Sequence, residues 1–304
     1  MLTRQKTTFY QLDKRLERLE ALAQQRKAQQ AQARKIAQIA DKLRSDPKEI
    51  MLYAGMTPDP WQSDFLESQA KRRILNCSRQ SGKSTVTASL AAHRVMTTPY
   101  ALILLVAASL RQSQELFRKV QTVYRGIGLK PTAESALRAE FSNHSRIVAL
   151  PATENIRGFS AVNLLVMDEA AWIPDQIYDT VRPMLAVSDG DMVLMSTPFG
   201  ERGFFYETWE DKENQFERYS ITAKQCPRIT PEFLADEKRS LNSLVYLQEY
   251  FCKFAGVMSQ AFSKEEIAEA FNTDSKPLDL DSDDNLASQL FDILNRPQAI
   301  GVPA

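Results

Sequence analysis

The sequence predicts an α/β fold with a mainly parallel sheet flanked by helices, to which a small lid subdomain and an N-terminal helical arm are added. Three observations support this prediction. Short apolar runs alternate with amphipathic segments of helical period, as in the crossover units of a parallel sheet. One apolar run leads into the turn Gly82-Lys83-Ser84, and another ends in the carboxylates Asp168 and Glu169. Both features are expected at the carboxyl edge of such a sheet, where ligands bind.

The first of these features is the stretch 74–85, ILNCSRQSGKST, which predicts a short strand, a tight loop and the start of a helix. Such a loop directs backbone N–H groups and a helix N-terminus towards one point, and this arrangement suits a polyphosphate. Lys83 would reach the β- and γ-phosphate oxygens, and Ser84 would hold the Mg²⁺ that bridges them. The predicted nucleotide-binding residues of the loop are Ser78, Arg79, Gln80, Ser81, Gly82, Lys83, Ser84 and Thr85.

The loop departs from the strict phosphate-binding pattern at one position. The pattern G-x-x-x-x-G-K-S/T begins with a glycine, and this chain has Cys77 there. The alternative interpretation is therefore an ordinary helix start, with the side chains of Lys83 and Ser84 in solvent.

The second feature is the apolar run 163–167, which is followed by two carboxylates. It predicts a buried parallel strand that delivers Asp168 and Glu169 to its carboxyl end. There Asp168 would hold the Mg²⁺ directly or through water, and Glu169 would orient and deprotonate the attacking water. An Asp-Glu helix cap is the alternative. Together the loop and the acid strand predict a P-loop ATPase; a P-loop kinase is a weaker alternative, because adjacent carboxylates suit the activation of water better.

The loop 79–84, RQSGKS, resembles the variant Walker A loop of the large terminase subunits of tailed bacteriophages, a family that also tolerates loss of the first glycine. Further features agree with that family and follow in its order, namely Trp61-Gln62, Arg157-Gly158, Asp168-Glu169-Ala170, Ser196-Thr197-Pro198 and Gly203-Phe204-Phe205. The resemblance covers roughly residues 58–262, the ATPase half of such proteins.

This resemblance implies an ATP- and Mg²⁺-dependent motor that packages viral double-stranded DNA into a procapsid. It also implies a homo-oligomeric ring, a portal protein and a small terminase subunit as partners, and a location in the host cytoplasm without membrane attachment. Two rival functions remain, a helicase-like translocase on cellular DNA and a non-catalytic nucleotide-binding assembly factor. Retention of both Lys83 and Glu169 argues against the assembly factor, because a scaffold has no need of a base.

The resemblance also suggests roles for residues outside the loop. Gln62 would read the adenine edge through its amide, and an aromatic staple at a helix start is the alternative for that motif. Arg79, within its own subunit, or Arg157, in a neighbour's site, would stabilise charge during hydrolysis, and a structural salt bridge is the alternative for each. Ser196 and Thr197 would report the nucleotide state to neighbouring elements, or would form a simple turn followed by proline.

We expect four regions along the chain: a basic helical arm at 1–46, a P-loop ATPase core at 47–215, a last strand with a helical lid subdomain at 216–272, and an acidic tail at 273–304. The arm lacks Gly and Pro and carries an excess of basic residues, so it is either a DNA- or partner-binding helix or a solvated one. The acidic residues of the tail lack the strands that would arrange them for two-metal chemistry, so we predict no nuclease activity in this chain.

The composition excludes several other classes of protein. The chain has 304 residues with 38 basic and 38 acidic side chains, so contact with nucleic acid has to depend on a local basic patch. The longest apolar run, 100–108, is about half a membrane span, and no N-terminal signal segment is expected. Cys77, Cys226 and Cys252 are scattered and odd in number, which favours reduced thiols over disulfides or a zinc site.

Overall fold

The structure is a computed structural model that describes residues 2–153 and 156–254. These residues belong to one compact unit, 1–256. The end of the expected lid region, 255–272, and the acidic tail expected at 273–304 lie outside the described residues. Within the described part of the chain, no helix is both long enough and apolar enough to cross a membrane.

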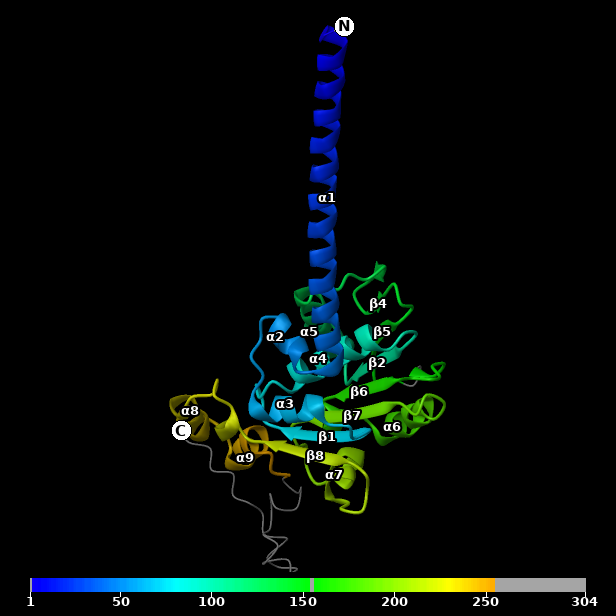
Figure 1. Ribbon diagram of the computed structural model, residues 1–304. Coiled ribbons are helices and arrows are strands. Elements are labelled where there is room, and N and C mark those ends of the chain that lie inside the picture. Colours follow the sequence, from blue (N-terminus) through cyan, green and yellow to red (C-terminus); the bar gives the residue numbers. More distant parts are fainter. Residues whose placement is uncertain (1, 154–155, 255–304) are drawn as a thin grey trace, which may run out of the picture. The chain divides into compact units, whose positions relative to one another are not determined.

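Eight strands of the described residues form one sheet in the order β3-β4-β5-β2-β6-β7-β1-β8 (Figure 1). They are β1 (Arg72–Cys77), β2 (Leu102–Ala107), β3 (Ala133–Glu134), β4 (Arg138–Glu140), β5 (Arg146–Pro151), β6 (Leu164–Asp168), β7 (Asp191–Ser196) and β8 (Glu217–Ile221). The pairings from β5 through β2, β6, β7 and β1 to β8 are all parallel, whereas β3 and β4 are antiparallel. This order confirms the predicted mainly parallel sheet.

The central strands are apolar on both faces because helices cover both faces of the sheet. Along β6, Leu164 and Val166 belong to one apolar cluster, and Leu165 and Met167 belong to the other, as the two-residue period of a strand requires. The first cluster includes side chains of α3 (Pro60–Glu67), α4 (Lys83–Thr97) and α5 (Leu110–Gly126), and the second includes side chains of α6 (Asp175–Val181) and α7 (Gly203–Glu210). Helix α4, which begins at Lys83, and strand β6, which ends at Asp168, therefore pack in the same apolar cluster.

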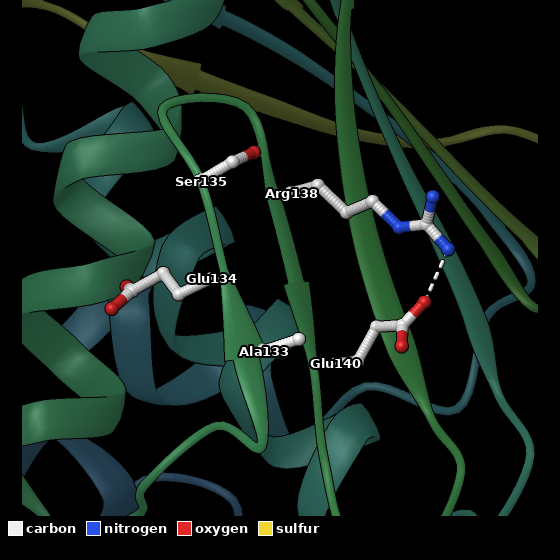
Figure 2. A pocket seen from close by; sticks show the side chains of 5 residues that line it. All are labelled: Ala133, Glu134, Ser135, Arg138 and Glu140. Carbon is white, nitrogen blue, oxygen red and sulfur yellow. Dashed lines mark hydrogen bonds and ion pairs between the residues drawn. The ribbon is translucent and has the colours of Figure 1, made fainter.

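A small hairpin, β3 and β4, lies at the end of the sheet order opposite to β8. Figure 2 shows that the Glu134 side chain points towards the neighbouring helix, whereas Arg138 and Glu140, which form an ion pair, point away from that helix. Glu134 accepts hydrogen bonds from Tyr124 and Arg125 of α5, and these donors lower the pKa of its carboxyl group. The hollow of about 340 Å³ at this hairpin therefore contains carboxylates that are already paired.

The N-terminal arm is a single helix of 44 residues, α1 (Leu2–Ser45), which would be about 66 Å long at 1.5 Å per residue. Its last turns are fixed on the core, because Leu43 is buried and Lys42 Nζ lies 2.9 Å from Glu49 Oε1 of α2 (Glu49–Tyr53). From position 22 to position 38 every side chain is exposed. These side chains have no burying contact within the described chain, and the role of the arm in binding DNA or a partner stays a prediction.

The lid follows β8 and contains the two helices that the sequence predicts, α8 (Pro231–Ser240) and α9 (Ser243–Phe251). Leu234, Tyr246 and Tyr250 form its small core, and the Tyr250 hydroxyl donates to Glu237 Oε2 at 2.8 Å. β8 pairs with β1 along all of its residues, so the region that begins at 216 starts inside the core sheet.

Candidate nucleotide-binding and catalytic site

Three neighbouring strands, β6, β7 and β1, deliver the predicted site residues to the same edge of the sheet (Figure 1). β1 leads into the loop 78–82, β6 ends at Asp168, and β7 ends at Ser196. A cavity of about 430 Å³ lies at this edge and is lined by Arg79, Gln80, Gly82, Lys83, Ser84, Thr85, Lys119, Glu169 and Arg228. Most of the predicted loop residues and the predicted base therefore meet at one cavity.

The missing first glycine has a structural explanation. Cys77 is the last residue of β1, fully buried and paired with Ile221 of β8, so its backbone is extended and does not require glycine. The left-handed conformations of the loop are at Gln80, with φ 58°, and at Gly82, with φ 96°. A Cβ atom at Gly82 would lie 2.5 Å from Gln62 Nε2, so the second glycine is required by both conformation and space.

Burial raises the pKa of the Cys77 thiol, which lies directly before the loop. The same cause raises the pKa of Cys252 to about 12. Cys77, Cys226 and Cys252 are all free and buried, as the sequence suggested. These neutral thiols do not supply a nucleophile to the cavity.

The backbone amides of the loop divide into two groups. Those of Ser78 and Arg79 donate to the carbonyl groups of Ile221 and Glu249, at 2.8 and 3.0 Å. Those of Gly82, Lys83 and Ser84 have no acceptor among the described residues. Unpaired N–H groups at the start of a helix favour an anion, and the loop therefore fits a phosphate group.

Lys83 and Glu169 face each other across this cavity. Lys83 Nζ lies 3.5 Å from Glu169 Oε1, and the Ser196 hydroxyl donates to Glu169 Oε2 at 3.3 Å. Glu169 has φ 51°, a left-handed conformation that is uncommon for a residue with a side chain. Its amide donates to Asp168 Oδ1 at 3.0 Å, and this bond fixes the Asp168 carboxylate relative to the backbone of Glu169.

Asp168 is buried at the end of β6, and this burial is the main cause that raises its pKa to about 6. The neighbouring charge of Glu169 adds to the shift, and Lys83 and Lys119 oppose it. A bound cation would favour the ionised form. The described residues contain no group of three or more His, Cys, Asp or Glu side chains that could hold a metal. The donor set, Asp168 and the Ser84 hydroxyl, suits Mg²⁺, which binds through few protein ligands and through phosphate oxygens.

The two candidate arginines lie in different places. Arg79 lines the cavity, and its Nε donates to Glu249 Oε2 of the lid at 2.6 Å. Arg157 is exposed and lines a separate hollow together with Phe159 and Val187. The structure therefore brings Arg79 to the site of its own chain and does not bring Arg157 there.

Three predicted nucleotide-binding residues do not line the cavity. Ser78 and Ser81 belong to the loop, but both residues are fully buried. Gln62 is 2 % exposed, its carbonyl oxygen accepts from the Asp59 amide at 2.9 Å, and its Nε2 donates to the Gly82 carbonyl at 3.3 Å. Its side-chain amide thus has partners within the protein, and its predicted adenine contact stays a prediction.

Sequence reasoning missed four residues of the site. Lys119 comes from α5, Arg228 from the segment before α8, and Glu249 from α9, while Asp59 precedes α3 and pairs with Arg228. Asp59 forms a capping box with Gln62 at the start of α3, and the other three residues lie in no motif. No local signal connects any of the four with the loop, because each reaches it only through the packing of helices and lid on the sheet.

The fold is the mainly parallel α/β sheet of P-loop NTPases, and the cavity at its carboxyl edge is the candidate nucleotide site. The model of the large terminase subunit family, T4-like virus type, N-terminal part, matches residues 74–269. The large terminase subunits of Thermus phage G20c and Thermus virus P23-45 are each 31% identical to this chain, over 69% of this chain and 51% of the relative. The chain therefore belongs to the large terminase subunit family, and it spans about half the length of these relatives.

Solved structures have the same fold. The ATPase domain of the large terminase of Thermus phage P74-26 has a TM-score of 0.61 at 24% identity, covering 67% of this chain and 97% of that domain. The large terminase of another thermophilic bacteriophage, solved in complex with ATP-γ-S, has a TM-score of 0.55 at 13% identity, covering 65% of this chain and 51% of that protein. At these identities the likeness shows the fold, and the chemistry of this chain has to be argued from its own residues.

Proposed function

We propose that this chain hydrolyses ATP and thereby drives the packaging of viral double-stranded DNA into a procapsid. The observation that carries the proposal is the cavity in which unpaired loop amides and Lys83 face Glu169. A phosphate-binding loop opposite a carboxylate that can activate water is the arrangement that hydrolysis of a nucleoside triphosphate needs.

The binding step would use the loop and the first turn of α4. The amides of Gly82, Lys83 and Ser84 would donate to phosphate oxygens, with the positive end of the helix dipole behind them. Lys83 would then contact the β- and γ-phosphate oxygens. Mg²⁺ held by Ser84 and Asp168 would neutralise charge on the β- and γ-phosphates.

The hydrolytic step would use Glu169 as the general base. Its carboxylate takes a proton from water while the water oxygen attacks the γ-phosphorus in line with the leaving ADP oxygen. Lys83 Nζ lies 3.5 Å from Glu169 Oε1. Phosphate oxygens would compete for Lys83, and this competition would release the carboxylate of Glu169 for the water.

Charge that develops during hydrolysis requires a further cation. Arg79 would supply it within the same subunit once it leaves Glu249, and Arg157 would supply it to the site of a neighbouring subunit. Arg157 is exposed and remote from the cavity of its own chain, which suits a role in trans. Such a finger would make turnover depend on assembly of a ring.

The remaining predicted residues connect the nucleotide to the rest of the motor. Gln62 would read the adenine base after exchanging one of its present partners. Ser196 already donates to Glu169, so the pair Ser196-Thr197 would report the state of the base to the elements after β7. Double-stranded DNA, a portal protein and a small terminase subunit are the proposed partners, in the host cytoplasm.

The test is ATP hydrolysis by the purified chain and by Glu169→Ala, each with and without double-stranded DNA, over a range of protein concentrations. We expect turnover that vanishes in Glu169→Ala, persists in the control Glu232→Ala on α8, and rises with concentration or DNA. Arg157→Ala should then lose the dependence on concentration. ATP binding without hydrolysis by the unmodified chain under all these conditions would overturn the motor and favour the non-catalytic assembly factor.

A further inference from the structure

Arg228 connects three segments that are far apart in the sequence. It lies between β8 and α8, and its Nη1 and Nη2 donate to Asp59 Oδ1 and Oδ2 at 3.0 and 2.6 Å. Nη2 also donates to the carbonyl oxygen of Ser81, inside the phosphate loop, at 3.1 Å. Asp59 is 8 % exposed and stands immediately before α3. One guanidinium thus joins the base of the lid, the start of α3 and the loop.

These contacts bear on the direction of the loop amides. The Ser81 carbonyl and the Gly82 N–H belong to one trans peptide, in which they point in opposite directions. Because Arg228 holds the carbonyl, it also fixes the direction of the Gly82 N–H, one of the amides without an acceptor among the described residues. The next carbonyl, that of Gly82, accepts from Gln62 Nε2 at 3.3 Å and from the amides of Thr85 and Val86 in α4 at 3.0 and 3.1 Å. The next N–H, that of Lys83, is oriented in the same way.

A single hydrogen bond to a carbonyl group would leave the guanidinium of Arg228 free to rotate. Here its orientation is fixed, because Nη1 and Nη2 each bond one carboxylate oxygen of Asp59. Bidentate pairs of this kind are stronger and more directional than single bonds between exposed charges. The Asp59 amide also donates to Gln62 Oε1 at 2.9 Å, so Asp59 is bonded to both of the residues that hold loop carbonyls. The three side chains form one connected network outside the loop.

We propose that Arg228, fixed by Asp59, is a positioning residue that holds the phosphate loop with its amides ready for the nucleotide. This inference rests on the proposed nucleotide-binding function and adds a residue that the terminase motifs do not contain. It also means that displacement of the lid changes phosphate affinity, because Arg228 belongs to the segment that leads into α8.

A competing role for Arg228 predicts an opposite effect. Arg228 lines the cavity, and a guanidinium there could bind phosphate directly as a cation. In that case the Asp59 carboxylate is a competitor, and Asp59→Asn would free the charge of Arg228 and tighten nucleotide binding. If Arg228 acts by holding the loop, Asp59→Asn removes its support and weakens binding. The sign of the change therefore distinguishes the two roles.

The experiment measures the affinity for a fluorescent ATP analogue, KM and kcat for ATP, and Tm, for Asp59→Asn, Arg228→Lys and Arg228→Ala. Asn retains the preference for a position before a helix, so α3 should persist in Asp59→Asn. We expect about tenfold weaker binding and a higher KM in Asp59→Asn and Arg228→Ala, as for the loss of a charged hydrogen bond, with kcat within about twofold. Lysine should not restore affinity, because it lacks the fork. The control is Arg239→Ala on α8, which removes an exposed arginine that pairs with Asp236 of its own helix.

The double variant Asp59→Asn with Arg228→Ala should bind no more weakly than Arg228→Ala alone, because both changes remove one network. Unchanged or tighter binding by Asp59→Asn would overturn the inference. If Arg228→Ala lowers Tm so far that it cannot be assayed, Asp59→Asn and Arg228→Lys decide the question. Failure of the unmodified chain to bind the analogue would instead count against the proposed function, so the two failures are distinguishable.

Discussion

Arg79 contacts Glu249 with both its main chain and its side chain. The Arg79 amide donates to the Glu249 carbonyl at 3.0 Å, and Arg79 Nε donates to Glu249 Oε2 at 2.6 Å. The side chain of Glu249 is 12 % exposed, and its negative charge is paired with the positive charge of Arg79. In this arrangement Glu249 of α9 pairs with the arginine that lines the cavity at the loop.

Replacing Glu249 should therefore change the affinity for ATP. Glu249→Gln removes the compensating charge, and we expect about two- to fivefold tighter ATP binding at low salt, with the gain declining as salt screens the freed arginine. Arg79→Ala should bind more weakly and hydrolyse more slowly. Calorimetric titration at two salt concentrations checks both. Glu232→Gln on α8 is the matched control, and weaker binding by Glu249→Gln would show that the pair is needed for the shape of the loop.

Ser196→Ala should reduce kcat without a comparable effect on KM. The Ser196 hydroxyl is the side-chain donor that holds Glu169 Oε2, and its loss lets the carboxylate turn away from the attacking water. We expect a fall in kcat of about tenfold, the effect of one hydrogen bond to a charged group. Steady-state kinetics measure it, with Ser240→Ala on the lid surface as the control. An unchanged kcat would mean that other groups orient Glu169.

Asp168→Asn should stabilise the protein in metal-free buffer. The folded chain holds the Asp168 proton more tightly than the unfolded chain does, with a pKa of about 6 against 3.8. The free energy of unfolding therefore falls as the pH rises from about 4 to about 6, and it stays low above that. Asparagine carries no charge, so we expect a gain of about 1 to 3 kcal/mol at pH 7.5 and little gain near pH 4.

Thermal denaturation of Asp168→Asn at the two pH values, in EDTA, checks this prediction. The same substitution should abolish hydrolysis, because it removes a proposed ligand of Mg²⁺. Equal stability of the variant and the unmodified chain at pH 7.5 would show that the buried carboxylate is compensated by other groups.

We expect the stack of Trp172 on Phe199 to affect kcat. Their ring centroids are 3.5 Å apart, and the stack joins the segment after Glu169 to the segment after Ser196-Thr197. Trp172→Ala should lower kcat several-fold and cost about 1 to 2 kcal/mol of stability, whereas Trp172→Phe should retain most of both. Kinetics and Tm measure this, with Trp209→Phe as the control. Full activity in Trp172→Ala would mean that the stack contributes to packing and not to turnover.

The sequence predicted the central sheet because its strands carry their own signal. Strands such as β2 and β6 are continuous apolar runs, since both faces are buried, and Lys83 and Glu169 follow directly from two of the strands. The short helices α2 and α6 were not predicted, because neither has enough residues to display a helical period. The sequence also did not reveal that Gln62 has partners inside the protein, since these come from Asp59 and Gly82.

The contacts between the lid and the loop could not be predicted for a different reason. Arg228 and Asp59 are separated by 169 positions, and Arg79 and Glu249 by 170. Each partner is an ordinary surface-type residue in its local sequence. Only the position of β8 beside β1 brings these residues together, and no pattern within one segment reports which strand becomes the neighbour of another.

The position of β8 also determines how the protein responds to a break in the chain. Lys212 is exposed in the turn between α7 and β8, so it is a natural target for trypsin. Cleavage there would separate the two halves covalently, but β8 would remain hydrogen-bonded to β1 along its five residues. The fragments should therefore migrate together on a native gel, separate in denaturant, and regain the nucleotide site when mixed. The lid helices are thus attached to the core sheet through β8, and fragment complementation could restore that attachment.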